Sequence, residues 1–373
     1  MTFIHQAEAA PLVEAAGAGF EAVGSEPLQK WTGPMARLKG LFGLGGVMGG
    51  MVRFTDAFCQ DGAEVLRRIG ADALLVDQLE PGGALLAEHL RLPFATLAVA
   101  MPINREIGVP PPYVGWRFDP SERGLKRNRG GWRVTDLLMR SLGAAIERNA
   151  RMLGLPPRGR LEECFSPSLQ LSQMAEGLDF ARRELPDSFH YVGPFSRGTP
   201  EPVDLPAGDD RPLVYCTLGT LQGSRASIFR RVAEACARLD LRLLITHGGL
   251  GDERPFPGNP IVRSWVPQRG AMAQADLVVC HGGMNSVLDA VAAGLPMVVM
   301  PLAFEQAAIA ARLDYAGVAQ VLSRRASAAR LANAIDDVRH QPRYRQRALE
   351  LQREIACAGG VVRAADLIEA KLT

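Results

Sequence analysis

Residues 277–306, LVVCHGGMNSVLDAVAAGLPMVVMPLAFEQ, give the clearest indication of the fold class. The apolar runs at 277–280 and 297–300 have the length and composition of buried strands, and residues 285–293 between them predict a helix. A strand, a turn of adjacent glycines, a helix and a second strand make up the βαβ unit of a parallel sheet. The stretch therefore predicts an α/β protein.

The same alternation of strand and helix extends along most of the chain. Strands are predicted at 2–5, 73–77, 95–99, 189–192, 212–217 and 241–246, and helices at 52–69, 134–153 and 226–239. We predict two doubly wound, Rossmann-like domains that face each other across a cleft. In such sheets, ligands bind beyond the carboxyl ends of the strands.

A linker is predicted at SRGTPEPVDLPAGDDRP, residues 196–212, where four prolines, two glycines and four acidic residues interrupt the apolar pattern. We assign 1–195 to the first domain, 196–211 to the linker and 212–359 to the second domain. The first domain starts unusually, because its opening residues predict the second strand, second helix and third strand of a Rossmann-like unit. The usual first strand and its helix, roughly 30 residues, are expected to be missing.

The composition excludes several classes of protein. With 47% hydrophobic and 22% charged residues the chain can form a full core, and 42 basic against 40 acidic residues give no field that would attract nucleic acid. Its six cysteines include no CxxC pair, which argues against a zinc site or a disulfide framework. No apolar run reaches the roughly 18 residues of a membrane span, and the start lacks a signal peptide, so we expect a cytoplasmic protein.

An anion-binding site is predicted where the strand 277–280 ends. His281 and two adjacent glycines precede the helix, and Asn285 and Ser286 lie in its first turn. Free amides and the helix dipole favour a phosphate at such a helix N-terminus. The alternative is structural: His281 would close a turn, Ser286 would cap the helix and the glycines would only reverse the chain.

Three further loops contribute polar side chains to the same end of the predicted sheet. Gly219 and Thr220 follow the strand 212–217 and can offer an amide and a hydroxyl to the same anion, although both are ordinary turn residues. An exposed Trp265 can stack on a base, with Gln268 bonding to its edge or to a ribose, whereas a single tryptophan is more often part of a core. Glu305 and Gln306 can bind sugar hydroxyls, or they can simply start a helix.

These residues together resemble the nucleotide-sugar signature of the family 1 glycosyltransferases, the UDP-sugar-dependent enzymes of GT-B fold. The resemblance covers essentially the whole chain. It rests on residues 265–268, 281–286, Asp289 and 305–306, and on the stretches VDQLEPGGALLAEHLRLPF, FSPSLQLSQM, LDFARRELPDSFHYVGP and CTLGTLQG, which are similar to the carotenoid-modifying branch. It also implies that the C-terminal helix, residues 360–373, crosses back to the first domain, which holds the acceptor.

The resemblance implies a role for each matching residue. In the family, the tryptophan at the position of Trp265 stacks on uracil, and the glutamine at the position of Gln268 contacts the nucleoside. The acidic residue at the position of Asp289 holds the ribose. The resemblance implies that the diphosphate is bound by His281, Asn285, Ser286 and Thr220. It implies that the glucose hydroxyls are bound by Glu305 and Gln306. Gly219, Val266, Gly283 and Met284 lie in the same motifs and complete the predicted donor-binding set. The family more often has Asp at the position of Glu305, and its plant members have Trp at that of Met284.

The expected reaction is transfer of glucose from UDP-glucose, a substrate rather than a cofactor, to a hydroxyl of a carotenoid such as zeaxanthin, with inversion. Asp77, after the strand 73–77, matches the aspartate that orients a catalytic histidine, although an Asp there is more often a helix cap. That histidine belongs in the loop after the missing first strand, and His5 is a weak substitute. Without its base the chain could be a non-catalytic nucleotide-sugar binder. The sequence has no Asp-x-Asp pair, so we predict no metal.

The acceptor side is less determined. The glycine-rich residues 40–54 fit either an apolar pocket wall or a flexible loop. Residues 122–133, ERGLKRNRGGWR, interleave basic residues with Trp132 and follow Trp116 and Phe118, which suits peripheral contact with an anionic membrane; a solvated charged loop is the alternative. The acceptor is expected to be a hydrophobic alcohol, with a macrolide or sterol as alternatives to a carotenoid. A dehydrogenase is disfavoured because no GxGxxG follows a strand.

Overall fold

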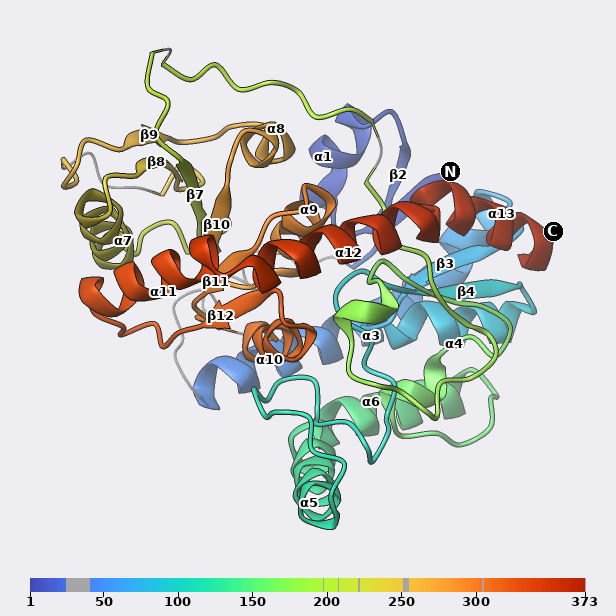
Figure 1. Cartoon of the computed structure of the whole chain (residues 1–373). Helices are drawn as coiled ribbons and strands as arrows, with labels where there is room; N and C mark the ends of the chain where they lie inside the picture. Colours follow the sequence, from blue (N-terminus) through green and yellow to red (C-terminus); the bar gives the residue numbers. More distant parts are fainter. Residues whose placement is uncertain are drawn as a thin grey trace.

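Strands and helices alternate along the computed structural model of the chain (Figure 1). It describes residues 1–24, 41–196, 198–206, 208–220, 222–250, 255–303 and 305–372, with the backbone alone at 41–47. All strand pairs described are parallel, as the sequence predicts. The chain has an α/β fold.

Two parallel sheets make up the N-terminal half. A two-stranded sheet pairs β1 (Thr2–His5) with β2 (Gly19–Ala22), and a four-stranded sheet has the order β3 (Leu74–Asp77), β4 (Phe94–Ala98), β5 (Gln170–Ser172) and β6 (Phe189–Tyr191). The helices of this half are η1 (Ala7–Ala9), α1 (Ala10–Ala15), α3 (Leu41–Arg68), α4 (Pro81–Leu90), α5 (Glu122–Leu138), α6 (Arg140–Met152), η3 (Leu161–Cys164) and η4 (Glu176–Leu178).

The C-terminal half contains one six-stranded sheet in the order β12-β11-β10-β7-β8-β9. Its strands are β7 (Leu213–Thr217), β8 (Arg242–Thr246), β9 (Ile261–Arg263), β10 (Leu277–Cys280), β11 (Met297–Val299) and β12 (Ala319–Val321). Its helices are α7 (Ala226–Arg238), α8 (Gln268–Ala273), α9 (Met284–Ala292), α10 (Gln306–Ala316), α11 (Ala328–His340) and α12 (Pro342–Ala358). The order reverses between β7 and β10, so the carboxyl ends of these two strands mark the switch point where ligands bind in doubly wound sheets.

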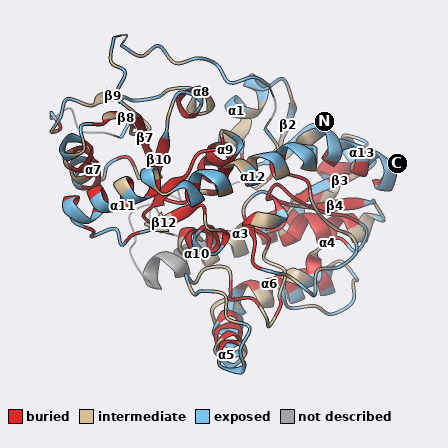
Figure 2. Cartoon of the chain, viewed as in Figure 1, coloured by how far each residue is buried: buried red, intermediate tan, exposed pale blue. Residues whose placement is uncertain are grey.

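Strand β10 shows why its sequence is apolar without alternation. Val278 and Cys280 belong to the core on one face of the sheet, whereas Leu277 and Val279 belong to the core on the other. Figure 2 shows the central strands of this sheet as buried, with exposed surfaces on the helices around them. Because a parallel sheet is covered on both faces, each residue of such a strand must be hydrophobic.

The last helix joins the two halves. Helix α12 ends at Ala358, and Gly359 and Gly360 then adopt φ values of +88° and +56°, which redirect the chain into α13 (Gly360–Leu372). Ala364, Leu367 and Leu372 of α13 share a core cluster with residues of the N-terminal sheet, among them Ala95 and Leu171. None of the helices in the described part of the chain is long and apolar enough to cross a membrane.

One predicted helix and the alternative of a charged loop at 122–133 were wrong. The predicted helix at 134–153 is two helices, α5 and α6, which meet at Met139, and residues 122–133 are the first turns of α5 rather than a loop. The side chain of Ser121 accepts a hydrogen bond from the backbone N–H of Gly124 and caps this helix. Of the glycine-rich segment 40–54, residue 40 lies outside the described residues and the rest begins α3.

Candidate active site

His281 lies in a narrow slot at the carboxyl end of β10. A Cβ atom on Gly283 would lie 2.5 Å from its Nε2, and one on Gly219 would lie 2.9 Å from its Cε1, so both neighbours must be glycine. Gly282 has φ +82° and turns the chain into α9. The amide of Gly219 donates to Thr217 Oγ1 at 3.3 Å, so it already has a partner, unlike the free donor that the sequence suggests. The structural role of Gly219 is therefore to admit the imidazole.

The imidazole of His281 is almost enclosed, since the residue is only 8% exposed. Burial lowers its pKa to about 4, although a hydrogen bond with the backbone of Thr217 acts in the opposite direction. The ring is neutral at physiological pH and can offer one N–H donor, not a positive charge. Its Nδ1 is buried and has no partner among the described residues.

Three of the sequence-predicted residues form a chain of hydrogen bonds beside α9. The hydroxyl of Ser286 donates to Oε1 of Gln268 at 3.1 Å, and Nε2 of Gln268 donates to Oδ2 of Asp289 at 2.7 Å. Burial raises the pKa of the Asp289 carboxyl, against the effect of the Gln268 hydrogen bond. The sequence separates Gln268 from Asp289 by 21 residues, and the fold brings them together.

Trp265 lies on the loop between β9 and α8 and is 66% exposed, which confirms the predicted exposed ring. The two apolar residues of the predicted donor set, Val266 and Met284, contact the core, unlike Trp265. Val266 packs against the core of the C-terminal half, and Met284 is 5% exposed within that core. Both residues therefore belong to the packing of the core.

Gln306 was expected to bind sugar hydroxyls, but its side chain is not free to do so. It is 5% exposed, and its Oε1 accepts hydrogen bonds from the backbone N–H groups of Leu302 and Ala303, both at 2.9 Å. Its backbone lies against the turn at Gly282. Glu305 is half-buried and precedes α10 without capping it. Thr220 is exposed at the neighbouring loop after β7.

Asp77 ends β3 in a half-buried position. Its Oδ1 accepts a hydrogen bond from the N–H of Leu79 at 2.8 Å, and burial raises the pKa of its carboxyl against that bond. No histidine within the described residues is hydrogen-bonded to Asp77. His5 ends β1 with its ring 5.1 Å from that of Phe54, and burial lowers its pKa.

A residue of the N-terminal half that no sequence pattern marks contacts the predicted phosphate site. Gln173 follows β5, and its Nε2 donates to Oδ1 of Asn285 at 3.1 Å. Its partner is 112 residues further along the chain, and no local pattern marks either residue for the other. Asn285 itself is exposed, in the first turn of α9.

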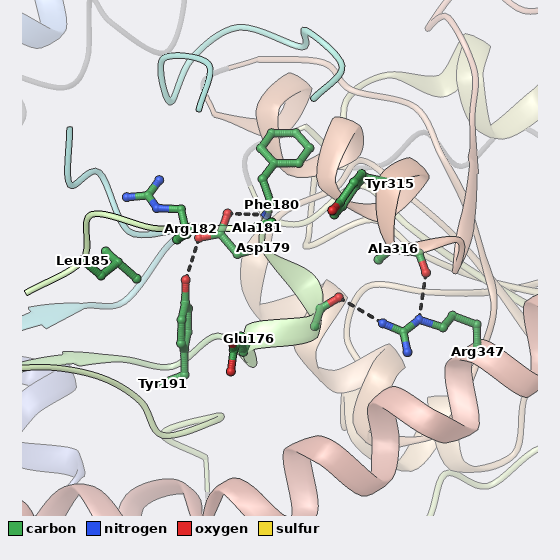
Figure 3. Close-up of a pocket in the computed structure, with 11 residues that line it drawn as sticks. Glu176, Asp179, Phe180, Ala181, Arg182, Leu185, Tyr191, Tyr315, Ala316 and Arg347 are labelled. Atoms are coloured by element: carbon green, nitrogen blue, oxygen red, sulfur yellow. Dashed lines mark hydrogen bonds between the residues drawn. The ribbon is translucent and has the colours of Figure 1, made fainter. Parts of the chain in front are cut away.

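A pocket of about 620 Å³ lies between the two halves, and its lining does not include His281 (Figure 3). It is lined from the N-terminal half by residues that include Asp179, Phe180 and Tyr191, and from the C-terminal half by residues that include Tyr315 and Arg347. The carboxylate of Asp179 accepts hydrogen bonds from the Tyr191 hydroxyl at 2.8 Å and from Nε of Arg312, on α10, at 2.6 Å. A buried ion pair therefore connects the two halves.

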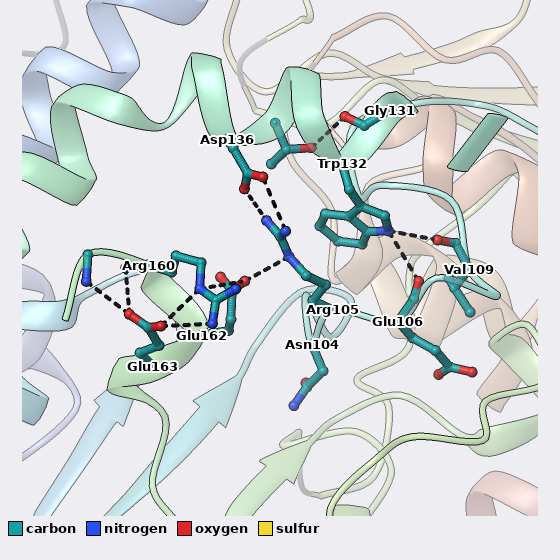
Figure 4. Close-up of polar contacts among 12 residues, drawn as sticks. Asn104, Arg105, Glu106, Val109, Gly131, Trp132, Asp136, Arg160, Glu162 and Glu163 are labelled. Carbon is teal, nitrogen blue, oxygen red and sulfur yellow. Dashed lines mark hydrogen bonds and ion pairs between the residues drawn. The ribbon is translucent and has the colours of Figure 1, made fainter. Parts of the chain in front are cut away.

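The aromatic residues around α5 are not exposed, contrary to the prediction of an aromatic membrane contact. Trp132 is 5% exposed, and its Nε1 donates to the carbonyl oxygens of Glu106 and Val109 (Figure 4). Arg105 lies over this ring, 4.9 Å from its centroid, and pairs with Asp136. The half-buried Trp116 and Phe118 also pack against other side chains, Arg127 in one case and Phe180 in the other.

The described residues contain no group of three or more His, Cys, Asp or Glu side chains arranged to hold a metal ion. The predicted independence of a metal remains a prediction, since it concerns the reaction rather than the geometry.

The fold and the site define a nucleotide-sugar glycosyltransferase, and comparison with known proteins shows the family. Residues 190–355 match the model of the family described as UDP-glucoronosyl and UDP-glucosyl transferase, and the chain belongs to this family. Similar relatives include a zeaxanthin glucosyltransferase of Pseudescherichia vulneris, 42% identical with 86% of this chain and 78% of that protein covered. Another is a zeaxanthin glucosyltransferase of Pantoea ananas, 35% identical with 99% and 88% covered.

Solved structures show the same fold. The calicheamicin glycosyltransferase CalG4 superposes with a TM-score of 0.77 at 24% identity, over 100% of this chain and 90% of that one. The glycotransferase of kitacinnamycin gives a TM-score of 0.75 at 22% identity, over 100% and 91%. The chain therefore has the GT-B fold, and the prediction of fold and family is confirmed.

Proposed function

We propose that the protein transfers glucose from UDP-glucose to a hydroxyl of a carotenoid such as zeaxanthin, with inversion and without a metal. The observation that carries the proposal is the convergence of His281, the N-terminus of α9 and the Gln268–Asp289 pair at the carboxyl ends of β7 and β10. The carotenoid acceptor is supported by the names of the two relatives at 42% and 35% identity.

The donor diphosphate is proposed to bind at the start of α9. The first backbone N–H groups of a helix have no intrahelical partner, and the helix dipole favours negative charge there. The neutral imidazole of His281 carries a single N–H, which can donate to the diphosphate in place of the backbone of Thr217. As the bond between glucose and phosphate breaks, charge builds up on the diphosphate, and donors already fixed in place stabilise it. Trp265 is proposed to stack on uracil, and Gln268 with Asp289 to bind the ribose.

The acceptor hydroxyl must lose a proton as it attacks the sugar from the face opposite to the leaving UDP. Asp77 is proposed to orient the histidine that takes this proton. One of its carboxylate oxygens already accepts from Leu79, which leaves the other free to accept an imidazole N–H. Within the described residues, His5 remains the weak substitute that the sequence indicates, because its ring packs against Phe54 and not against Asp77; burial lowers its pKa.

Product analysis tests this function. UDP-glucose and zeaxanthin in detergent, followed by mass spectrometry, should give zeaxanthin mono- and diglucosides, and a chelator should not change the rate. His281→Ala should reduce the yield by about 100-fold or more, the cost of losing one donor to a developing anion. A protein that binds no UDP, or that leaves zeaxanthin unmodified while it glucosylates another alcohol, contradicts the donor or the acceptor respectively.

Contact with an anionic membrane is proposed through α5, which projects from the body of the molecule (Figure 1). Its exposed face carries Arg123, Lys126, Arg129 and Arg133, and ends in Leu137, which is 68% exposed. Each basic residue near an anionic surface contributes about 1 kcal/mol. The protein should float with vesicles that contain anionic lipid and be released by salt, and Arg129→Glu with Arg133→Glu should weaken this binding. Absence of salt-sensitive flotation contradicts the proposal.

A further inference from the structure

We propose that Gln173 is a positioning residue for the donor phosphate, because it fixes the orientation of the Asn285 side-chain amide so that Nδ2 faces the anion. This inference rests on the proposed function, in which Asn285 lies at the diphosphate. It assigns a role in donor binding to a side chain of the half of the molecule opposite to the donor site.

The geometry around Gln173 is specific. The residue follows β5, its backbone N–H donates to the carbonyl oxygen of Ala98, and it is 6% exposed. Its Nε2 contacts two acceptors, the backbone carbonyl oxygen of Val99 and Oδ1 of Asn285, the second at 3.1 Å. Both hydrogens of this amide nitrogen therefore have partners.

The backbone carbonyl of Val99 determines the direction of the whole chain of contacts. A carbonyl oxygen can only accept, so the atom of Gln173 that touches it must be the nitrogen, which donates. The same nitrogen also touches Asn285, and a nitrogen with two hydrogens and no accepting lone pair requires an oxygen there. Oδ1 of Asn285 is thereby fixed toward Gln173. The NH2 group of Asn285, which carries two donors, must point the other way.

That direction matters because the two ends of an asparagine amide have opposite polarity. With Nδ2 toward the site, Asn285 adds a donor to those at the start of α9; with Oδ1 there, it would present a partial negative charge to a phosphate oxygen. An exposed asparagine that lacks Gln173 can rotate between the two. Gln173 itself cannot move easily, because the next residues, Met174 and Ala175, are buried in a core cluster that also contains Met284 and Val287.

Calorimetry with UDP and with uridine, which lacks the diphosphate, tests this role. Gln173→Met keeps the length and flexibility of the side chain but removes its donors. We expect UDP to bind about tenfold more weakly to this variant, which corresponds to the loss of one hydrogen bond to a charged group, and uridine to bind as before. Gln170→Met is the matched control. Gln170 is also a buried glutamine of the β5 segment, but its amide bonds to Ser166 and Asn104 within the N-terminal half.

A double-mutant cycle separates positioning from a general effect on the fold. In the Asn285→Ala background, Gln173→Met should change the UDP affinity less than twofold, because no amide remains to be oriented. Gln173→Glu should weaken UDP binding more than Gln173→Met, since a carboxylate accepts from Nδ2 and turns Oδ1 of Asn285 toward the phosphate. This excess loss should largely disappear with Asn285→Ala.

Each result decides between named alternatives. Equal UDP affinity of the wild type and Gln173→Met overturns the positioning role, and so does an equal loss for UDP and uridine or an undiminished loss in the Asn285→Ala background. Weaker UDP binding by Gln170→Met of the same size shows a structural effect and also overturns it. A wild-type protein that does not bind UDP removes the proposed function, and this inference with it.

Discussion

The ion pair between Asp179 and Arg312 gives the largest effect on stability that the structure predicts. The side chains are 0% and 2% exposed, so water does not screen them, and Nε of Arg312 lies 2.6 Å from Oδ1 of Asp179. Asp179→Asn keeps the shape but removes the charge, and it leaves the guanidinium buried without a counterion. Removal of one partner from such a pair costs about 3–5 kcal/mol. We therefore expect the free energy of unfolding to fall by about 3 kcal/mol or more.

The assay is urea unfolding followed by circular dichroism, with two controls. Glu147→Gln removes the partner of Arg151 in a pair whose side chains are 52% and 78% exposed, and such a helix pair is worth only about 0.3–0.5 kcal/mol. The double variant Asp179→Leu with Arg312→Met leaves no unpaired charge and should be more stable than Asp179→Asn. A cost for Asp179→Asn as small as that of Glu147→Gln would show that burial does not make this ion pair costly to break.

The same ion pair predicts a dependence on pH. Burial alone would raise the pKa of the Asp179 carboxyl, but Arg312 and Arg182 outweigh it and hold the pKa below its ordinary value. A carboxyl whose pKa is lower in the folded state stabilises the protein above its unfolded pKa, about 3.9, and loses this contribution as the pH falls through the folded pKa. Asp179→Asn should remove this part of the acid-induced loss of stability.

Two further perturbations test the donor site, and a third tests a buried carboxyl at the start of α4. Trp265→Ala should weaken UDP and uridine binding alike, by about 1–3 kcal/mol for a stacked base, without lowering the melting temperature, because the ring is 66% exposed; an unchanged affinity for uridine contradicts the stacking. Gly283→Ala should abolish UDP binding, since its Cβ would lie 2.5 Å from Nε2 of His281, and calorimetry showing wild-type affinity would exclude the tight slot. Burial is the main cause that raises the pKa of Glu80 to about 8. The unfolded state therefore releases this proton at a lower pH, and the free energy of unfolding should fall between about pH 5 and 8. Glu80→Gln should flatten that part of the pH profile in urea titrations, and an unchanged slope contradicts the assignment.

The local pattern of the sequence predicts the C-terminal sheet well. Strands such as β7 and β10 are buried on both faces, so hydrophobicity alone marks them, and the glycines beside His281 mark a close approach. The helical character of the basic segment of α5 was not predicted, because it depends on burial of Trp132 against Glu106 and Val109, 26 and 23 residues away. Helix propensity is weak there, and tertiary contacts decide.

The side chains that join the two halves could not be found from the sequence for the same reason. Gln173 contacts Asn285 across 112 residues and Asp179 contacts Arg312 across 133, yet both start from one short segment after β5. Asn285 lies in the first turn of α9 and Arg312 in α10, so this segment contacts both helices that begin at residues expected to bind the diphosphate and the glucose. A change in how the halves meet must then alter the position of both helices, and with them the donor site. The contact between the two halves is therefore part of the proposed donor site, although none of its N-terminal residues belongs to the nucleotide-sugar motif.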